Sequence, residues 1–126
     1  MPTPDFGGQT PLIPVPIAKT ADYTVLATDN GRLFTTRGAS GAVTFTLPAV
    51  TNLPAGFSVD FFNVAATGMV IASNGSSDNI VALNDAGADT ITCTTTSRMI
   101  GAYVKVIFDG TGWLAIEGAG ATYVVA

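Results

Sequence analysis

Two acidic side chains, Asp60 and Glu117, lie in stretches where apolar and polar residues alternate, a pattern typical of strands. A pair of carboxyl groups can hydrolyse a glycosidic bond when one acts as general acid and the other as base or nucleophile. Any two outward acids on a β-sandwich would give the same pattern, so this pair alone does not predict a glycosidase. The sequence contains no histidine, which is the commonest general base. We therefore expect no enzyme activity and no catalytic residue.

A second group of oxygen-bearing side chains lies in the segment "SNGSSDNIVALNDAGAD" and could bind calcium, which prefers carboxylate and amide oxygens. Their spacing matches no EF-hand loop, and each side chain lies where a β-turn is expected. Asp29-Asn30-Gly31 is likewise interpreted as a tight turn rather than as half of an acidic site. We expect no metal at these positions, which in the longer segment are Asn74, Asp78, Asn79, Asn84, Asp85 and Asp89.

The only cysteine, Cys93, has no histidine to activate it and lies in a threonine-rich segment, so we interpret it as a small core residue. Trp113 together with Tyr103 and Tyr123 could form a platform on which a sugar stacks. Trp113 directly follows a tight-turn signal, however, and we expect it to close one end of the core instead. Nothing in the sequence predicts a cofactor.

The charge pattern argues against two classes of partner. Five Lys and Arg residues stand against nine Asp and Glu residues, giving a net charge of −4, and no basic patch suited to nucleic acid is present. No apolar run approaches the roughly 18 residues of a membrane helix, and no signal peptide is visible, so we expect no membrane association. Only 11% of the residues are charged, which indicates a Ser/Thr/Asn/Gly surface or burial between subunits.

The chemistry-bearing residues would be positioned by strands, which the sequence predicts from Tyr23 onward. In "AVTFTLPAV" the residues Val43, Phe45 and Leu47 share one face. "GFSVDFFNV" alternates in the same way until Phe62, which indicates a bulge or a second buried face. "AYVKVIFDGTGWLAIEG" is typical of a hairpin with an Asp-Gly turn. Shorter candidate strands are Thr24–Ala27, Arg32–Thr35, Met69–Ala72, Ile80–Leu83, Thr90–Thr95 and Thr122–Val125.

No segment has a helical period, and the helix formers Glu, Lys and Gln occur only once, twice and once. The sequence therefore predicts an all-β protein, with residues 21–126 forming a single antiparallel β-sandwich of jelly-roll-like arrangement.

The first twenty residues have a different character, because they hold five of the seven prolines. Proline fixes φ and removes a donor, so this stretch cannot be a helix or a central strand. We expect residues 1–20 to be an extended arm without regular secondary structure that contacts other chains. The apolar residues between the prolines, which we assign to this contact, are Phe6, Leu12, Ile13, Val15 and Ile17.

The other end of the chain is also apolar. Tyr123, Val124 and Val125 are expected to contact neighbouring copies in a homotrimer, because an unpaired strand edge promotes association.

The segment from about Tyr23 to Glu117 resembles a β-sandwich module found in virion proteins of tailed bacteriophages. The resemblance rests on a D-x-G-x-L-F turn, a G-A-x-x-F-x-L-P strand, a P-x-G-F-x-V strand and a final Asp-Gly turn followed by tryptophan. The matching residues are Asp29, Gly31, Leu33 and Phe34; Gly41, Ala42, Phe45, Leu47 and Pro48; Pro54, Gly56, Phe57 and Val59; and Asp109, Gly110 and Trp113.

Such modules occur in small head proteins and in tail fibres. Because the chain has the length of one sandwich and an arm, we expect a complete capsid decoration (cement) protein. The resemblance then implies a homotrimer on the outer capsid surface of the virion, with the major capsid protein as partner and the arm lying on the shell. The alternative is a tail-fibre or adhesin-type module that binds glycans or a receptor, which would need two or three aromatic side chains exposed on one face.

Overall fold

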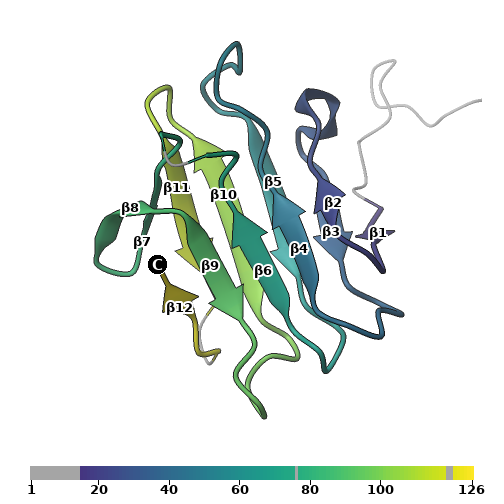
Figure 1. The fold of residues 1–126 in the computed structure, drawn as a ribbon. Helices are drawn as coiled ribbons and strands as arrows, with labels where there is room; N and C mark the ends of the chain where they lie inside the picture. The colour runs from purple at the N-terminus through teal and green to yellow at the C-terminus, as the bar shows by residue number, and fades with distance from the viewer. Residues whose placement is uncertain (1–14, 76, 119–120) are drawn as a thin grey trace, which may run out of the picture.

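Two β-sheets pack face to face in the computed structural model, which describes residues 15–75, 77–118 and 121–126 (Figure 1). The first sheet has seven strands in the order β1-β3-β5-β10-β11-β7-β8, and the second has five in the order β12-β9-β6-β4-β2. The expected all-β sandwich is therefore confirmed at the level of its architecture. The strands are β1 (Ile17–Ala18), β2 (Tyr23–Thr24), β3 (Leu33–Thr35), β4 (Val43–Thr46), β5 (Ser58–Phe62), β6 (Met69–Ala72), β7 (Ile80–Ala82), β8 (Asp85–Ala88), β9 (Thr90–Cys93), β10 (Tyr103–Phe108), β11 (Trp113–Glu117) and β12 (Val124–Val125), with one 3-10 turn, η1 (Ala27–Asp29).

The sheets are mixed, which differs from the expected antiparallel sandwich. Of the ten strand pairs among the described residues, five are parallel: β1 with β3, β3 with β5, β2 with β4, β4 with β6, and β11 with β7. A jelly roll is built from antiparallel neighbours, so these pairs also depart from that arrangement. Alternation along a strand reports which face is buried and carries no information on the direction of the neighbouring strand.

The parallel pairs arise from the way in which the first six strands are wound. β1, β3 and β5 belong to the seven-stranded sheet, whereas β2, β4 and β6 belong to the five-stranded sheet. The chain therefore crosses from one layer to the other after each strand and returns to lie beside the strand it made one turn earlier. A strand that returns after one full turn runs in the same direction as its predecessor, as in a β-solenoid.

Side chains from both sheets form one core. Val43, Phe45 and Leu47 are all 0% exposed, as their alternation predicts. Three phenylalanines from the two layers meet at its centre, with ring centroids 5.8 Å apart for Phe34 and Phe45 and 4.9 Å apart for Phe45 and Phe61. Aromatic pairs at this separation contribute about 0.5–1.5 kcal/mol beyond the burial of their area. The winding thus places β3, β4 and β5 around a shared aromatic cluster.

Phe62 follows the buried Phe61 but does not mark a bulge. The register between β5 and β10 is continuous from Ser58 to Phe62, and the side chain of Phe62 points outward with 39% of its surface exposed. The expectation of a bulge at this position is therefore wrong. Phe62 continues the regular alternation and places an apolar ring on the outer face of the seven-stranded sheet.

The strand predicted over Thr24–Ala27 is shorter and starts one residue earlier, because β2 covers only Tyr23–Thr24. The chain then forms the 3-10 turn η1 from Ala27. Asp29 causes this turn, because its Oδ2 atom accepts hydrogen bonds from the backbone N–H of Leu26 at 2.8 Å and from the hydroxyl of Tyr23 at 2.7 Å. Gly31 follows with a φ of 79°, which glycine adopts without strain. The Asp29-Asn30-Gly31 segment is thus a turn, as its sequence predicts.

The predicted hairpin is present in the second half of the chain, where β10 and β11 pair from Val104–Glu117 to Phe108–Trp113. Its turn is closed by Asp109, whose Oδ1 atom accepts hydrogen bonds from the backbone N–H groups of Thr111 at 2.8 Å and Gly112 at 3.0 Å. These bonds favour the ionised carboxylate, so they hold the pKa of Asp109 below its ordinary value.

Candidate functional site

Asp60 and Glu117 lie on opposite faces of the seven-stranded sheet. Asp60 pairs with Lys105 on the outer face, whereas Glu117 pairs with the fully buried Val104. The expectation that Glu117 points outward is therefore wrong, and a pair of carboxylates flanking one substrate cannot form here. The parity of β11 carries this information, because Trp113 and Glu117 are four residues apart and share a face.

Glu117 instead borders the core near Cys93. Its Oε2 atom is buried and has no hydrogen-bond partner, and burial raises the pKa of the carboxyl group. Cys93 is 0% exposed, as expected for a small core residue. Burial and the negative charge of Glu117 raise the pKa of the Cys93 thiol to about 12, so the thiolate needed for nucleophilic chemistry does not form at neutral pH.

Two of the acidic side chains considered for calcium accept hydrogen bonds from backbone N–H groups. Asp78 accepts a hydrogen bond from the backbone N–H of Val50 at 3.2 Å, and Asp85 accepts one from that of Gly87 at 2.9 Å. Asn84 has a φ of 67°, which asparagine tolerates better than most residues. In the part of the chain that the structure describes, no three His, Cys, Asp or Glu side chains gather as metal ligands would.

The three aromatic residues considered for sugar stacking do not share a surface. Trp113 is 0% exposed and packs edge-on against Phe57, with ring centroids 5.9 Å apart, as expected for a core residue. Tyr103 is half-buried on the outer face of β10. The hydroxyl of Tyr123 accepts a hydrogen bond from the backbone N–H of Tyr103 at 3.2 Å and donates one to the backbone carbonyl of Tyr103 at 2.9 Å. Among described residues, Phe62 is the one aromatic side chain that is exposed.

The predicted arm meets the sandwich at its last residues. Phe6, Leu12 and Ile13 lie outside the described residues. Val15 is 70% exposed, whereas Ile17 is half-buried against the core and pairs with Phe34 as part of β1. The expectation that residues 1–20 form no regular secondary structure is therefore wrong for β1. Ile17 belongs to the sandwich, whereas Val15, two residues earlier, is exposed.

The C-terminal residues assigned to subunit contacts also take part in the fold. β12 pairs with β9 at the edge of the five-stranded sheet, and Tyr123 and Val125 pack against the core of their own chain. Val124 alone among the three points outward, with 56% of its surface exposed. Of these three side chains, Val124 is therefore the one that is placed to contact a partner.

A buried polar network organises one end of the sandwich. The hydroxyl of Thr36 donates to Asn63 Oδ1 at 2.6 Å and accepts from the backbone N–H groups of Val64 and Ala65 at 2.9 and 3.1 Å. Asn63 in turn donates to the carbonyl groups of Ala65 and Met99 at 3.0 and 2.8 Å. The loops at residues 63–66 and 99–102 are thereby held together.

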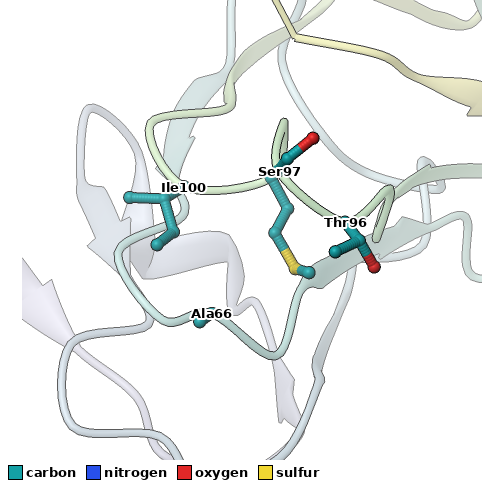
Figure 2. A pocket seen from close by; sticks show the side chains of 5 residues that line it. Ala66, Thr96, Ser97 and Ile100 are labelled. Carbon is teal, nitrogen blue, oxygen red and sulfur yellow. The ribbon is translucent and has the colours of Figure 1, made fainter.

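These loops border a shallow pocket of about 180 Å³ (Figure 2). The pocket is open to solvent and contains no charged side chain, since its lining residues are Ala66, Thr96, Ser97, Met99 and Ile100. Ile100 at its rim is 66% exposed. The lining has the hydroxyl groups of Thr96 and Ser97 but no acidic or basic side chain beside them, so it offers few groups to activate or orient a ligand.

One surface was not singled out from the sequence: the outer face of the seven-stranded sheet, where Leu114 and Ile116 are 39% and 51% exposed. The sequence "WLAIE" could have indicated this face. A strand with one face in water usually alternates apolar and polar residues, whereas β11 has apolar residues on both of its faces.

Comparison with known proteins gives no family for the chain: no protein-family model matches it, and neither does any curated protein. Within the described ranges, no helix has the length and apolar character needed to cross a membrane. The function must therefore be argued from the surfaces described above.

Proposed function

We propose that the protein is a structural component of a bacteriophage virion, a decoration protein that binds the outer surface of the head and stabilises the capsid lattice. The observation that carries the proposal is the apolar segment that leads into β1. Val15 is 70% exposed directly before the sheet begins, and the preceding sequence alternates prolines with apolar residues. An exposed apolar side chain such as that of Val15 is suited to contact another protein.

The arm would act through extended contact with the major capsid protein. Sixteen residues precede β1, and in a bound polyproline II conformation they would span roughly 50 Å. Prolines restrict the free arm, so less conformational entropy is lost on binding. Burial of a valine or isoleucine side chain contributes about 1.5–3 kcal/mol. Three arms on a homotrimer would bind with an avidity well above that of one arm.

The described sandwich supports a structural role through what its residues do. The acidic pair is split between two faces, the thiol is buried, and Asp78 and Asp85 accept hydrogen bonds from backbone N–H groups. The resemblance of Tyr23–Glu117 to phage virion modules supports the same proposal from the sequence.

The test uses heads that lack the decoration protein. We expect the native chain to co-sediment with these heads and to raise their resistance to heat and low salt. Removing residues 1–15 should abolish both effects, and Ile13→Asp and Val15→Asp should weaken them, because each places a charge where apolar contact is required. The deletion stops before Ile17, so that β1 remains in the sheet.

Leu26→Asp is the matched control, because Leu26 is also an exposed apolar residue, 53% accessible, but lies outside the arm. If the arm-deleted protein binds and stabilises heads as well as the native chain, the arm is not the binding element. If the native chain does not bind heads but binds host cells or a glycan array, the adhesin-type alternative replaces this proposal.

A further inference from the structure

The outer face of the seven-stranded sheet carries an apolar surface that the sandwich itself leaves uncovered. Strand register places its outward residues in three rows. The first row runs Val81, Leu114, Ile107 and Ser58; the second runs Ile116, Lys105, Asp60 and Leu33; the third runs Tyr103, Phe62, Thr35 and Ala18. Four of these side chains are large, apolar and exposed: Phe62 39%, Val81 43%, Leu114 39% and Ile116 51%.

The outer face of the five-stranded sheet has a different composition. Its registers place Thr24, Thr46, Ala72 and Thr90 in one row and Thr44, Val70, Thr92 and Val124 in the next. Threonine hydroxyl groups hydrogen-bond with water, and this face follows the inward-apolar, outward-polar pattern of a solvated sheet. The two outer faces of one molecule are thus suited to different surroundings, the threonine-rich face to water and the apolar face to protein.

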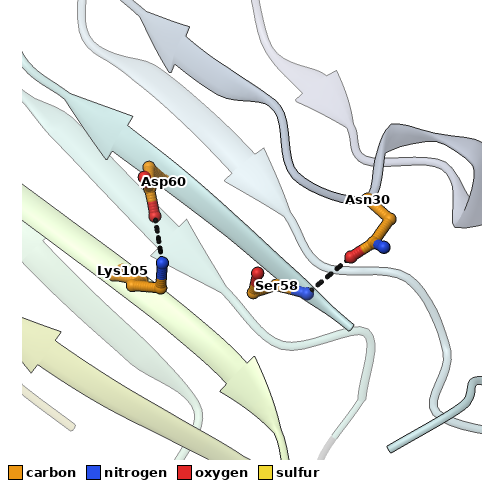
Figure 3. Close-up of polar contacts among 4 residues, drawn as sticks. All are labelled: Asn30, Ser58, Asp60 and Lys105. Carbon is orange, nitrogen blue, oxygen red and sulfur yellow. Dashed lines mark hydrogen bonds and ion pairs between the residues drawn. The ribbon is translucent and has the colours of Figure 1, made fainter. Parts of the chain in front are cut away.

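The apolar face carries a single ion pair at its centre. Lys105 Nζ lies 3.6 Å from Asp60 Oδ1, and both side chains are about one-third exposed (Figure 3). Among the residues of the three rows these are the only charged side chains, so the face has no net charge. The whole chain has a net charge of −4. Two copies that meet through this face therefore avoid the repulsion that their acidic residues would cause elsewhere.

We propose that this face binds the same face of a second copy of the chain. Shape favours this occupant, because two sheet faces pack well against each other about 10 Å apart, with their strands within about 30° of each other. Because the same face is used by both copies, this contact gives a two-fold dimer and is distinct from the contact that would build the expected homotrimer. It is separate from the arm's contact with the shell, so either can fail alone.

The test measures the mass of the purified chain by sedimentation equilibrium between about 1 and 100 µM. We expect the native chain, whose monomer is 12.8 kDa, to associate in this range. Leu114→Glu should weaken association at least tenfold, because it buries a charge in the contact. Leu26→Glu should leave it unchanged, since Leu26 is also an exposed leucine, 53% accessible, but lies at the start of η1 and outside the three rows. Circular dichroism establishes that each variant is folded.

A pair of opposite charges provides a second, independent arm of the experiment. Ile116→Glu and Ile116→Lys should each be monomeric alone and should associate when mixed, which general destabilisation cannot produce. A native chain that is monomeric at 100 µM overturns the proposal, as does a Leu114→Glu variant that associates like the native chain. A native chain that is monomeric alone, but whose binding to undecorated heads is weakened by Leu114→Glu, would assign the face to the shell protein instead.

Discussion

Thr36 is the residue on which the buried polar network depends, because its single hydroxyl group makes three hydrogen bonds. Thr36→Val keeps the shape and leaves two backbone N–H groups and Asn63 Oδ1 without this partner. We expect it to lower the free energy of unfolding by about 2–4 kcal/mol, whereas Thr36→Ser, which retains the hydroxyl, should lose less. Urea denaturation followed by the fluorescence of Trp113 measures both. Equal stability of the two variants would contradict the role given to the hydroxyl.

Glu117 makes stability depend on pH in a defined direction. Burial raises its pKa above the ordinary value of 4.5, so the folded state favours the protonated carboxyl. The stability that this protonation contributes is complete below 4.5 and is lost as pH rises through the folded-state pKa. Glu117→Gln is neutral at every pH. We therefore expect it to be more stable than the native chain at pH 7, with the difference shrinking as pH falls to 4.

The comparison between variant and native chain isolates Glu117 from other carboxyl groups. Asp109 acts in the opposite sense, because its pKa is lowered and its contribution is lost on acidification, but it is present in both proteins. Urea midpoints at pH 7 and pH 4 are the measurement. A difference between the two proteins that is the same at both pH values would show that burial of the Glu117 carboxyl does not matter.

At the scale of elements, β1 separates the sandwich from the arm within two residues. Ile17 packs against the core, whereas Val15 is 70% exposed. We expect Ile17→Asp to reduce stability by about 1–3 kcal/mol, and Val15→Asp to change it by less than about 0.5 kcal/mol. Thermal unfolding followed by circular dichroism tests both. A large loss for Val15→Asp would mean that the arm is part of the folded domain.

The sequence predicts the strands of this protein better than their arrangement. Alternation located β4, β5 and β10 and their buried faces, because a period of two is set by each strand alone. It could not reveal that β3 and β5 are parallel, because pairing direction depends on the path of the chain between strands. The face of Glu117 was predictable from its parity with Trp113. The apolar outer face was harder to predict, because Phe62 on β5 and Ile116 on β11 share a face only once both strands are paired with β10.

For the molecule as a whole, the position of a strand within its sheet should determine how fast its amides exchange with solvent. β10 lies between β5 and β11, and β6 lies between β4 and β9, whereas β1 and β12 are two-residue strands at sheet edges. We expect amides of β6 and β10 to exchange only through global unfolding, and those of β1 and β12 to exchange through local opening. Hydrogen–deuterium exchange measures this gradient. Protection of β12 equal to that of β6 would mean that the sandwich opens as a single unit.

The winding of the first six strands also bears on how such a chain can change in length. Each turn adds one strand to each layer, so β1 and β2 form the end of both sheets together (Figure 1). A duplicated turn inserted ahead of β3 would find a parallel neighbour in each layer and would leave the β10–β11 hairpin untouched. The sandwich can therefore lengthen by internal duplication at one end while its other end stays constant. The number of strands in each layer can therefore change during evolution in steps of one turn.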